Sequence, residues 1–336
     1  MKRSQNTWKF LLLSLLLLGL ILLSLLWGQY SLTVGEVLQA LSAGLTGQGW
    51  SSDDTVFAVV CRIRLPRIIL ACLVGACLSA AGAAYQGVFQ NPMAAPDLLG
   101  ASSGAAFGAA LAILLGFSVG GVTALAFVSS ILAVLCAYWV GQRARGRKTV
   151  NLILAGVMIS SLLSAGTSYM KLVADPSSQL PEITYWLMGS LSGTRLQEIG
   201  LAALPMAAGA VVLLVLRWRI NLLTFGDQEA RTLGIHASRL RLAVILAATL
   251  MTAASVSVSG MIGWVGLIIP HLSRRLVGND YRALLPCSMI MGAAFLLLVD
   301  DLARNLLITE IPIGILTAVL GAPFFIYLML GEERFA

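Results

Sequence analysis

Apolar runs that approach the length of a membrane span recur along nearly the whole chain. A transmembrane helix needs about 20 consecutive, mostly apolar residues. Hydrophobic residues make up 58% of the 336 and charged residues 11%, whereas a soluble domain carries about 25% charged residues. The sequence therefore predicts an all-α, polytopic membrane protein that forms a single domain over residues 1–336. About ten transmembrane helices are expected, at 10–27, 66–88, 97–116, 121–140, 150–171, 196–216, 242–259, 263–278, 284–300 and 311–330.

Basic residues are unevenly distributed among the connections between these segments. If the N-terminus lies in the cytosol, the outer connections hold few of the 22 Lys and Arg, namely Arg62, Arg64, Arg67, Lys171, Arg195 and Arg304. Cytosolic loops of membrane proteins carry the excess of Lys and Arg, so both termini are predicted to be cytosolic. The net charge of +7 then reflects basic loops beside anionic lipid headgroups and implies no nucleic-acid partner.

A polar segment interrupts the apolar pattern at residues 217–241, where the sequence reads RWRINLLTFGDQEARTLGIHASRLR. It is too polar to cross a bilayer, and its centre, from Gly226 to Gly234, places good helix formers between two glycines. We expect a short helix that lies flat on the cytosolic face. A rigid polar element of this kind indicates a cytosolic protein partner.

Two outer connections differ in their pattern. Residues 28–65 are expected to form a long first loop. Near residues 182–190, Pro181 suits the first turn of a short helix and Gly189 suits its end. This short outer helix could be a gate, or it could be an interfacial anchor through Tyr185 and Trp186; the residues alone favour the anchor.

A faint internal repeat is also present. The spacing is the same from Gly82 to Pro92 to Gly100 as from Gly260 to Pro270 to Gly278. In the predicted topology the two copies run in opposite directions, which would make the chain two inverted repeats of about five helices. Coincidence among three matched residues is the alternative.

The predicted spans contain no arrangement suited to catalysis, metal binding or ion coupling. Ion-coupled carriers usually need ionisable groups in their pathway, yet no span carries a Lys or Glu at its centre. The segment 141–149 imitates a phosphate-binding loop, but Arg147 separates the second glycine from the lysine and no strand is expected before it. His271 has no second histidine nearby in the sequence. We expect no catalytic residue, no metal site and no nucleotide cofactor in this chain.

Several short motifs follow one another in a fixed order along most of the chain: Arg64-Leu-Pro66-Arg67, Gln90-Asn91-Pro92-Met93-Ala94-Ala-Pro96, Tyr185-Trp186-Leu-Met-Gly189, Gly260-Met-Ile-Gly-Trp-Val-Gly266-Leu-Ile-Ile-Pro270-His271, Glu310-Ile-Pro312-Ile-Gly314 and Gly321-Ala-Pro323-Phe324-Phe. Together they resemble the FecCD/BtuC-type permeases, which are membrane subunits of type II ABC importers for iron(III)-siderophores, haem, cobalamin and molybdate. The resemblance implies a BtuC-like ABC importer permease fold with ten helices and an inverted repeat. It is specific for the family and only weakly specific for the substrate.

The same resemblance implies a set of partners in the bacterial cytoplasmic (inner) membrane. A second permease copy would complete a homodimer, or a related permease a heterodimer, with the pathway between the subunits. Two ABC ATPase subunits would bind the cytosolic face and carry ATP and Mg²⁺, and a substrate-binding protein, periplasmic or lipid-anchored, would dock outside. The segment 217–241 would be the cytosolic coupling segment, with its matching positions at Gly226, Glu229, Ala230, Leu233 and Gly234.

Three arginines match positions that pair with glutamates of the binding protein: Arg64, Arg67 and Arg304. Charge pairs at the rim of an interface suit steering and register. From the residues alone, Asp300 and Asp301 beside Arg304 are expected within reach of water, either as a salt-bridged helix end or in a functional role.

Two further groups match the gates of the family. Asn91, Met93, Thr149 and Val150 correspond to the cytosolic gate. Tyr185, Trp186, Met188 and Gly189 correspond to the outer gate helix. This second match leaves gating and anchoring both open for residues 182–190.

The expected function is therefore ATP-driven import of a metal-chelate substrate, in the first place an iron(III)-siderophore, by alternating access. The same machinery carrying haem or cobalamin, or less readily molybdate, is the alternative within the family. Outside the family, a secondary active carrier and an integral membrane enzyme are the competing interpretations. The chain itself would be a transport subunit without catalytic activity of its own.

Overall fold

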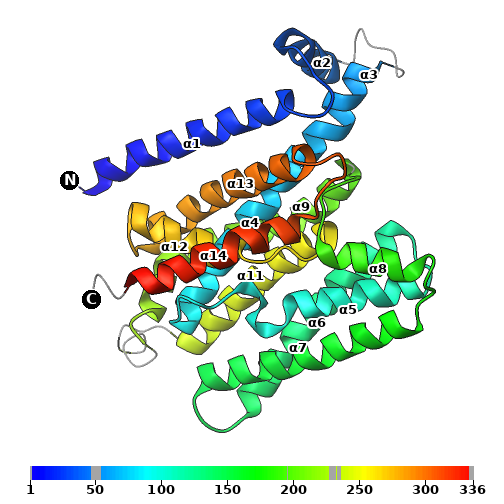
Figure 1. Ribbon diagram of the computed structural model, residues 1–336. Helices are drawn as coiled ribbons and strands as arrows, with labels where there is room; N and C mark the ends of the chain where they lie inside the picture. The colour runs from blue at the N-terminus through cyan, green and yellow to red at the C-terminus, as the bar shows by residue number, and fades with distance from the viewer. Residues whose placement is uncertain (1, 47–53, 195, 227–231, 233–235, 333–336) are drawn as a thin grey trace.

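The computed structural model describes residues 2–46, 54–194, 196–226, 232 and 236–332, and it is helical with no strand in these ranges. Figure 1 shows one helical bundle in which α1 begins and α14 ends at the same end. The helices are α1 (Lys2–Leu26), α2 (Val34–Thr46), α3 (Thr55–Phe57), α4 (Leu65–Phe89), α5 (Ala101–Leu114), α6 (Val119–Arg143), α7 (Lys148–Val173), α8 (Gln179–Met188), α9 (Leu196–Leu223), α11 (Ala237–Ser259), α12 (Val265–Val277), α13 (Tyr281–Asn305) and α14 (Ile313–Glu332).

Seven helical stretches in the described chain are long and apolar enough to cross a membrane. They are α1, the continuous run Thr55–Phe89, α6, α7, α9, α11 and α13. The shorter apolar helices α5 and α14 and the 13-residue α12 complete the bundle. These ten elements fall on the ten predicted segments, which confirms the all-α polytopic architecture.

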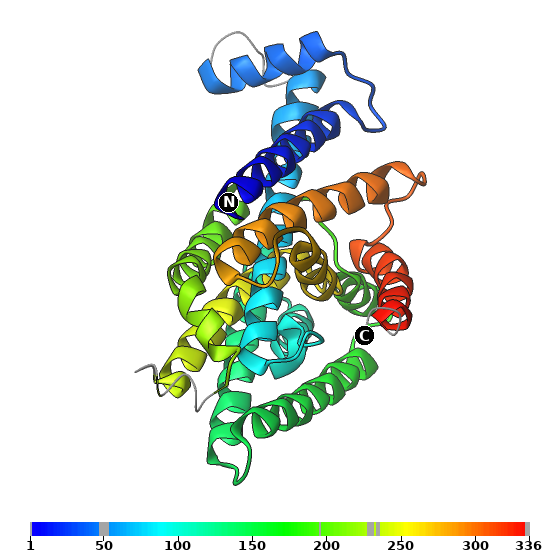
Figure 2. The ribbon, with the colours of Figure 1, turned by 90° about the vertical axis from the view of Figure 1, so that its left-hand side faces the viewer.

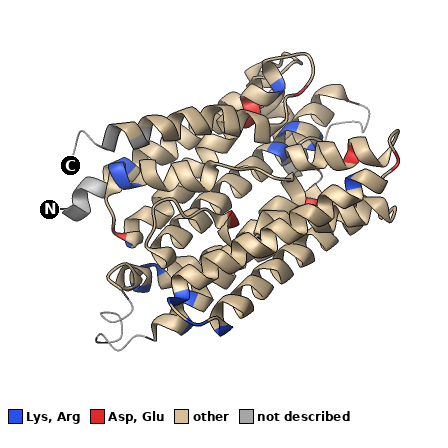
Figure 3. Ribbon diagram, turned by 60° about the horizontal axis from the view of Figure 1, so that its bottom comes forward, with Lys and Arg blue, Asp and Glu red and all other residues tan. Residues whose placement is uncertain are grey.

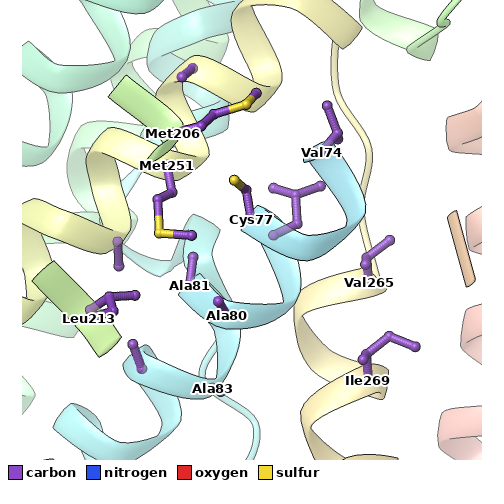
Figure 4. Packing of buried hydrophobic residues seen from close by; sticks show 14 of the residues in the cluster. Val74, Cys77, Ala80, Ala81, Ala83, Met206, Leu213, Met251, Val265 and Ile269 are labelled. Atoms are coloured by element: carbon purple, nitrogen blue, oxygen red, sulfur yellow. The ribbon is translucent and has the colours of Figure 1, made fainter. Parts of the chain in front are cut away.

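The centre of the bundle is α4, most of whose residues are buried. It packs against α13, α11, α12 and α9. Figure 4 shows α4 between α11 and α12, with Cys77 and Ala81 on the side of Met251 and with Val265 and Ile269 on the opposite side. Because the α4 side chains at these contacts are small, the neighbouring helices approach it closely.

Glycines make the closest of these approaches. A Cβ added to Gly75 would collide with the carbonyl of Gly292 on α13, and one added to Gly82 would collide with the backbone of Gly266 on α12. Lipid tails offer no hydrophobic drive for helix association, so membrane helices depend on close packing of this kind. The glycines of α4, α12 and α13 therefore stabilise the core.

The chain forms two halves of similar pattern. Each half contains a long helix that is largely buried, α4 or α11, followed by irregular chain and a short helix, α5 or α12. The first residues of α4 and the last residues of α11 lie at the same end of the bundle, near α8. Arg67 of α4 binds Glu310, which is close in sequence to Ile313, and the N–H of Ile313 donates to the carbonyl of Gly189 at the end of α8. The next residue, Ser190, donates to the carbonyl of Ser259 at the end of α11. The two halves thus run in opposite directions, as expected for an inverted repeat.

The glycine–proline spacing is not the mark of this repeat. Gly82 lies inside α4, whereas Gly260 caps α11 with φ of 66°. Pro92 lies in a turn, whereas Pro270 lies inside α12. Since the matched positions occupy different local structures, the equal spacing is a coincidence. The inverted repeat is present, but the interpretation that this spacing marks it was wrong.

The expectation of a long loop at residues 28–65 was also wrong. The described part of this region contains α2, α3 and a π-helix, Ala58–Arg64, that continues directly into α4. Glu36 accepts hydrogen bonds from the backbone N–H and the hydroxyl of Thr33, at 2.7 and 2.8 Å, which is the pattern of a capping box. Figure 2 shows α2 extending beyond the ends of α1 and α13.

Candidate functional site

Buried charges join α4 to the connection between α13 and α14. Nε of Arg67 lies 3.0 Å from both carboxylate oxygens of Asp300, and Nη1 lies 2.8 Å from Oε1 of Glu310. The side chain of Arg67 is 7% exposed and that of Asp300 is fully buried. A buried charge that loses its partner is strongly destabilising, so Arg67 holds the end of α13 and the segment around Glu310 in place.

A second pair lies beside the first and includes α1. Arg304 donates to the carboxylate of Asp301, and its Nη2 donates to Oγ of Ser24 at 2.7 Å. The Ser24 hydroxyl in turn donates to Asp301 at 2.7 Å. We call the residues Ser24, Arg67, Asp300, Asp301, Arg304 and Glu310 the buried charge network.

Asp300 and Asp301 do not reach water, and that expectation was wrong. Both are fully buried, and both are paired with arginines. The alternative, a salt-bridged helix end, is confirmed. The sequence could not show the closure of the network, because Arg67 binds partners 233 and 243 residues further along the chain.

The three predicted docking arginines are all buried: Arg64 is 3%, Arg67 6% and Arg304 8% exposed. Arg64 donates to the carbonyls of Leu25 and Tyr30, each at 2.5 Å. Their role in docking stays a prediction. In this geometry it requires the guanidinium groups to exchange internal acceptors for carboxylates of a binding protein.

The predicted outer gate helix is observed as α8, and it is tied to two other helices. Gly189 ends α8 with φ of 75°, and its carbonyl accepts from the N–H of Ile313 at the start of α14, at 3.0 Å. The N–H of Ser190 donates to the carbonyl of Ser259 at the end of α11, at 2.8 Å. Gly314 fits beneath the carbonyl of Met188. Movement of α8 would therefore pull on α11 and α14.

The chain enters α8 through a well-ordered acidic turn. Asp175 accepts hydrogen bonds from the Ser177 hydroxyl at 2.7 Å and from the hydroxyl and N–H of Ser178 at 2.6 and 2.8 Å. These bonds, above all those from the Ser178 and Ser177 hydroxyls, hold the pKa of Asp175 below its usual range. Within α8, Tyr185 is half exposed and Trp186 is partly buried.

The predicted cytosolic gate residues lie at the opposite end of the bundle. Asn91 and Met93 are exposed in the turn after α4, where Oδ1 of Asn91 accepts from the N–H of Met93 at 2.9 Å. Thr149 and Val150 lie in the first turn of α7, and Val150 is half exposed. Their role as a gate stays a prediction.

Of the predicted coupling residues, Gly226 is described and adopts φ of 115°. Glu229, Ala230, Leu233 and Gly234 lie outside the described residues. The helix that leads into this segment is well anchored. Asn221 of α9 donates to Asp280 at 2.8 Å and accepts from the N–H of Tyr281, at 2.9 Å, at the start of α13.

The two ends of the bundle differ in their balance of charge, and Figure 3 shows several basic residues gathered at the end where α1 begins and α14 ends. The connections and helix ends there hold Arg143, Arg145, Arg147, Lys148, Arg217, Arg219, Arg239, Arg241, Arg274, Arg275 and Arg282. The α8 end holds the acidic residues Glu36, Asp54, Asp175, Glu182, Glu198 and Glu310 together with the basic residues Arg62 and Lys171 and the buried Arg64, Arg67 and Arg304. In membrane proteins the basic side is normally the cytosolic one.

A helical membrane bundle with an inverted repeat, a short helix at one end and a basic polar segment at the other defines a transport permease. Comparison with known families then identifies the group. A model of the FecCD transport family matches residues 15–331, and the chain belongs to this family. It is thus a multi-pass membrane permease of the ABC importer type.

Individual relatives differ in their named substrates. The chain is 42% identical over 317 residues to the molybdate import system permease protein MolB of Haemophilus influenzae, covering 93% of this chain and 92% of the relative. It is 43% identical over 271 residues to a probable iron chelatin transport system permease protein of Helicobacter pylori, covering 81% and 82%. A solved inward-facing structure of a putative metal-chelate type ABC transporter matches with a TM-score of 0.85 and 39% identity, over 95% of this chain and 97% of that one.

Proposed function

We propose that this permease imports an iron(III)-siderophore across the bacterial inner membrane as a dimer, with both termini in the cytosol. ATP hydrolysed by two ATPase subunits at the 217–241 face would drive alternating access, and a binding protein would deliver the chelate at the α8 end. The distribution of charge supports this orientation in the membrane, because the start of α1, the end of α14 and the basic connections lie at one end of the bundle.

The same distribution supports the choice of cargo. Among the described charged residues of the α8 end that are not buried, the acidic ones outnumber the basic Arg62 and Lys171, and a surface with an excess of one sign repels ions of the same sign. Molybdate is a small dianion, and haem carries two propionates, so both would meet this repulsion. A neutral or cationic iron chelate would not. Similarity does not choose between them, because the relatives named for molybdate and iron chelatin are about equally identical to the chain.

The contacts also suggest how force would pass through the subunit. Asn221 ties the helix before the coupling segment to the start of α13. Helix α13 then runs from Tyr281 to Asn305, with Pro286 near its start, and the buried charge network fixes its far end to α4 and α1. We expect α13 to move as a rigid body, so that a displacement on the ATPase side also shifts the α8 end.

Cargo choice is tested by uptake into proteoliposomes that contain the permease, its ATPase and its binding protein. We expect ATP-dependent accumulation of a ⁵⁵Fe-labelled siderophore at least tenfold above that of molybdate, haem and cobalamin presented in the same way. Equal or faster uptake of one of the other three would overturn the siderophore assignment and leave the ABC importer assignment standing.

A further inference from the structure

A furrow runs along the outside of the bundle between α6 and α9. Both helices pack against α11, which forms the floor of the furrow. Three cavities of about 310, 210 and 430 Å³ follow one another along it. The first two share lining residues, among them Thr123, Glu198 and Ser257, so they are continuous.

The lining residues repeat at helical spacing. On α9 the furrow is lined in turn by Glu198, Leu201, Pro205, Gly209 and Val212. With a rise of 1.5 Å per residue, this row is roughly 21 Å long, which exceeds half the ~30 Å thickness of a bilayer core. The second and third cavities are lined almost entirely by apolar surface. A single acyl chain has the shape and polarity of this furrow.

The mouth of the furrow at the α8 end is polar and acidic. Glu182 of α8 and Glu198 of α9 both line the first cavity, together with hydroxyls such as those of Ser190 and Thr194. The described residues that line this mouth include no Lys or Arg. Two carboxylates therefore face a cavity whose described walls offer no counter-charge, and a primary ammonium group would provide charge and N–H donors together.

The mouth also lies at the depth where lipid headgroups are found. Tyr185 and Trp186 line it, and such aromatic residues are enriched at membrane–water interfaces. Along α9, the lining of the furrow changes from polar at Glu198 to apolar further in. A phospholipid changes in the same order, from its headgroup to its acyl chains. In Figure 2, α9 and α11 lie on the opposite side of the bundle from α14, so the furrow does not share a face with α14.

We propose that this furrow binds one phospholipid with a primary amine headgroup, such as phosphatidylethanolamine. Glu182 and Glu198 hold the ammonium group, and one acyl chain lies on α11 between α6 and α9. The headgroup contacts α8 directly, because Glu182, Tyr185 and Trp186 all belong to that helix. The lipid thus supports the gate helix at the surface formed by Glu182, Tyr185 and Trp186.

Native mass spectrometry of the purified permease tests the headgroup. The protein is loaded with phosphatidylethanolamine, phosphatidylcholine or phosphatidylglycerol of identical acyl chains. We expect retention of the ethanolamine lipid at least tenfold above the other two. In the double variant Glu182→Gln with Glu198→Gln this preference disappears, because the loss of two charge-assisted hydrogen bonds removes at least a factor of ten. Glu36→Gln, an acidic residue of the same end, is the control and leaves the preference unchanged.

A second pair of variants tests the furrow itself. Gly120 lines the second cavity and has open space where a Cβ would be placed, so Gly120→Leu adds an apolar side chain at the wall of the furrow. We expect it to lower retention of the ethanolamine lipid, whereas Gly200→Leu, also unobstructed but absent from the walls of the furrow, does not. Equal retention of the three lipids by the unchanged protein overturns the proposal. So does a Gly120→Leu variant that alters the oligomeric state and not lipid retention, since a second protein copy would then cover this face. Neither readout depends on transport.

Discussion

Arg67 connects three parts of the chain that are far apart in sequence. It lies at the start of α4, binds Asp300 near the end of α13, and binds Glu310 in the connection to α14. Such a residue is held mainly by electrostatic attraction in a place from which water is excluded. Its contribution is visible only when one partner is removed and the remaining charge is left buried.

Replacement of Asp300 by alanine should therefore be costly. We expect Asp300→Ala to destabilise the permease by about 3–5 kcal/mol, because Arg67 then retains only the partly exposed Glu310. Arg62→Ala is the matched control. Arg62 is exposed, and its removal should change stability by less than about 1 kcal/mol. Thermal unfolding of the detergent-solubilised protein measures both, and similar shifts for the two variants would contradict a structural role of the network.

At the scale of helices, α9 and α13 are connected by two hydrogen bonds of one side chain. Asn221 uses both ends of its amide, donating to Asp280 and accepting from the N–H of Tyr281. These two bonds join the helix that precedes the coupling segment to the helix that reaches the opposite side of the membrane. They connect the end of α9 to the helix that carries Asp300 and Asp301 of the buried charge network.

Loss of this connection should separate ATP hydrolysis from transport. We expect Asn221→Ala to reduce substrate uptake severalfold while ATP hydrolysis by the assembled complex continues, since the coupling segment would move without α13. Arg219→Ala, exposed on the same helix, should leave both rates unchanged. Parallel assays of uptake and phosphate release check this. Equal loss of both activities in Asn221→Ala would indicate failed assembly and contradict the coupling role.

The elements were more predictable from sequence than the contacts between them. Hydrophobic runs predict the ten bundle helices, because the bilayer imposes both their length and their composition. Gly189 and Pro181 predict α8 through local backbone preferences. Helix α2 was missed although Thr33 and Glu36 have the spacing of a capping box. Asn221 and Glu182 were missed for a different reason: their importance lies in neighbours that only the folded bundle brings to them.

The predicted docking arginines also show that the sequence does not predict the contacts between helices. A motif match places Arg64, Arg67 and Arg304 in a functional group, but it does not reveal whether a charge is exposed or paired. The structure buries all three. Any binding protein that engages them must first compete with Asp300, Asp301 and the carbonyl of Leu25, so docking and opening of this end would be linked events.

For the molecule as a whole, the two inverted halves meet along α4, and α8 lies at the end opposite the end of α9 and the start of α11. Few described ionisable groups lie between these ends, so the chain offers no evident path for a coupling ion. Membership of the FecCD family points to ABC ATPases as the energy source proposed above.

This central claim is tested most directly by energised uptake in proteoliposomes that contain the permease with and without its ATPase. We predict that ATP sealed inside the vesicles drives substrate accumulation only when the ATPase is present, and that a proton or sodium gradient alone drives none. Accumulation driven by an ion gradient in vesicles without the ATPase would contradict the account.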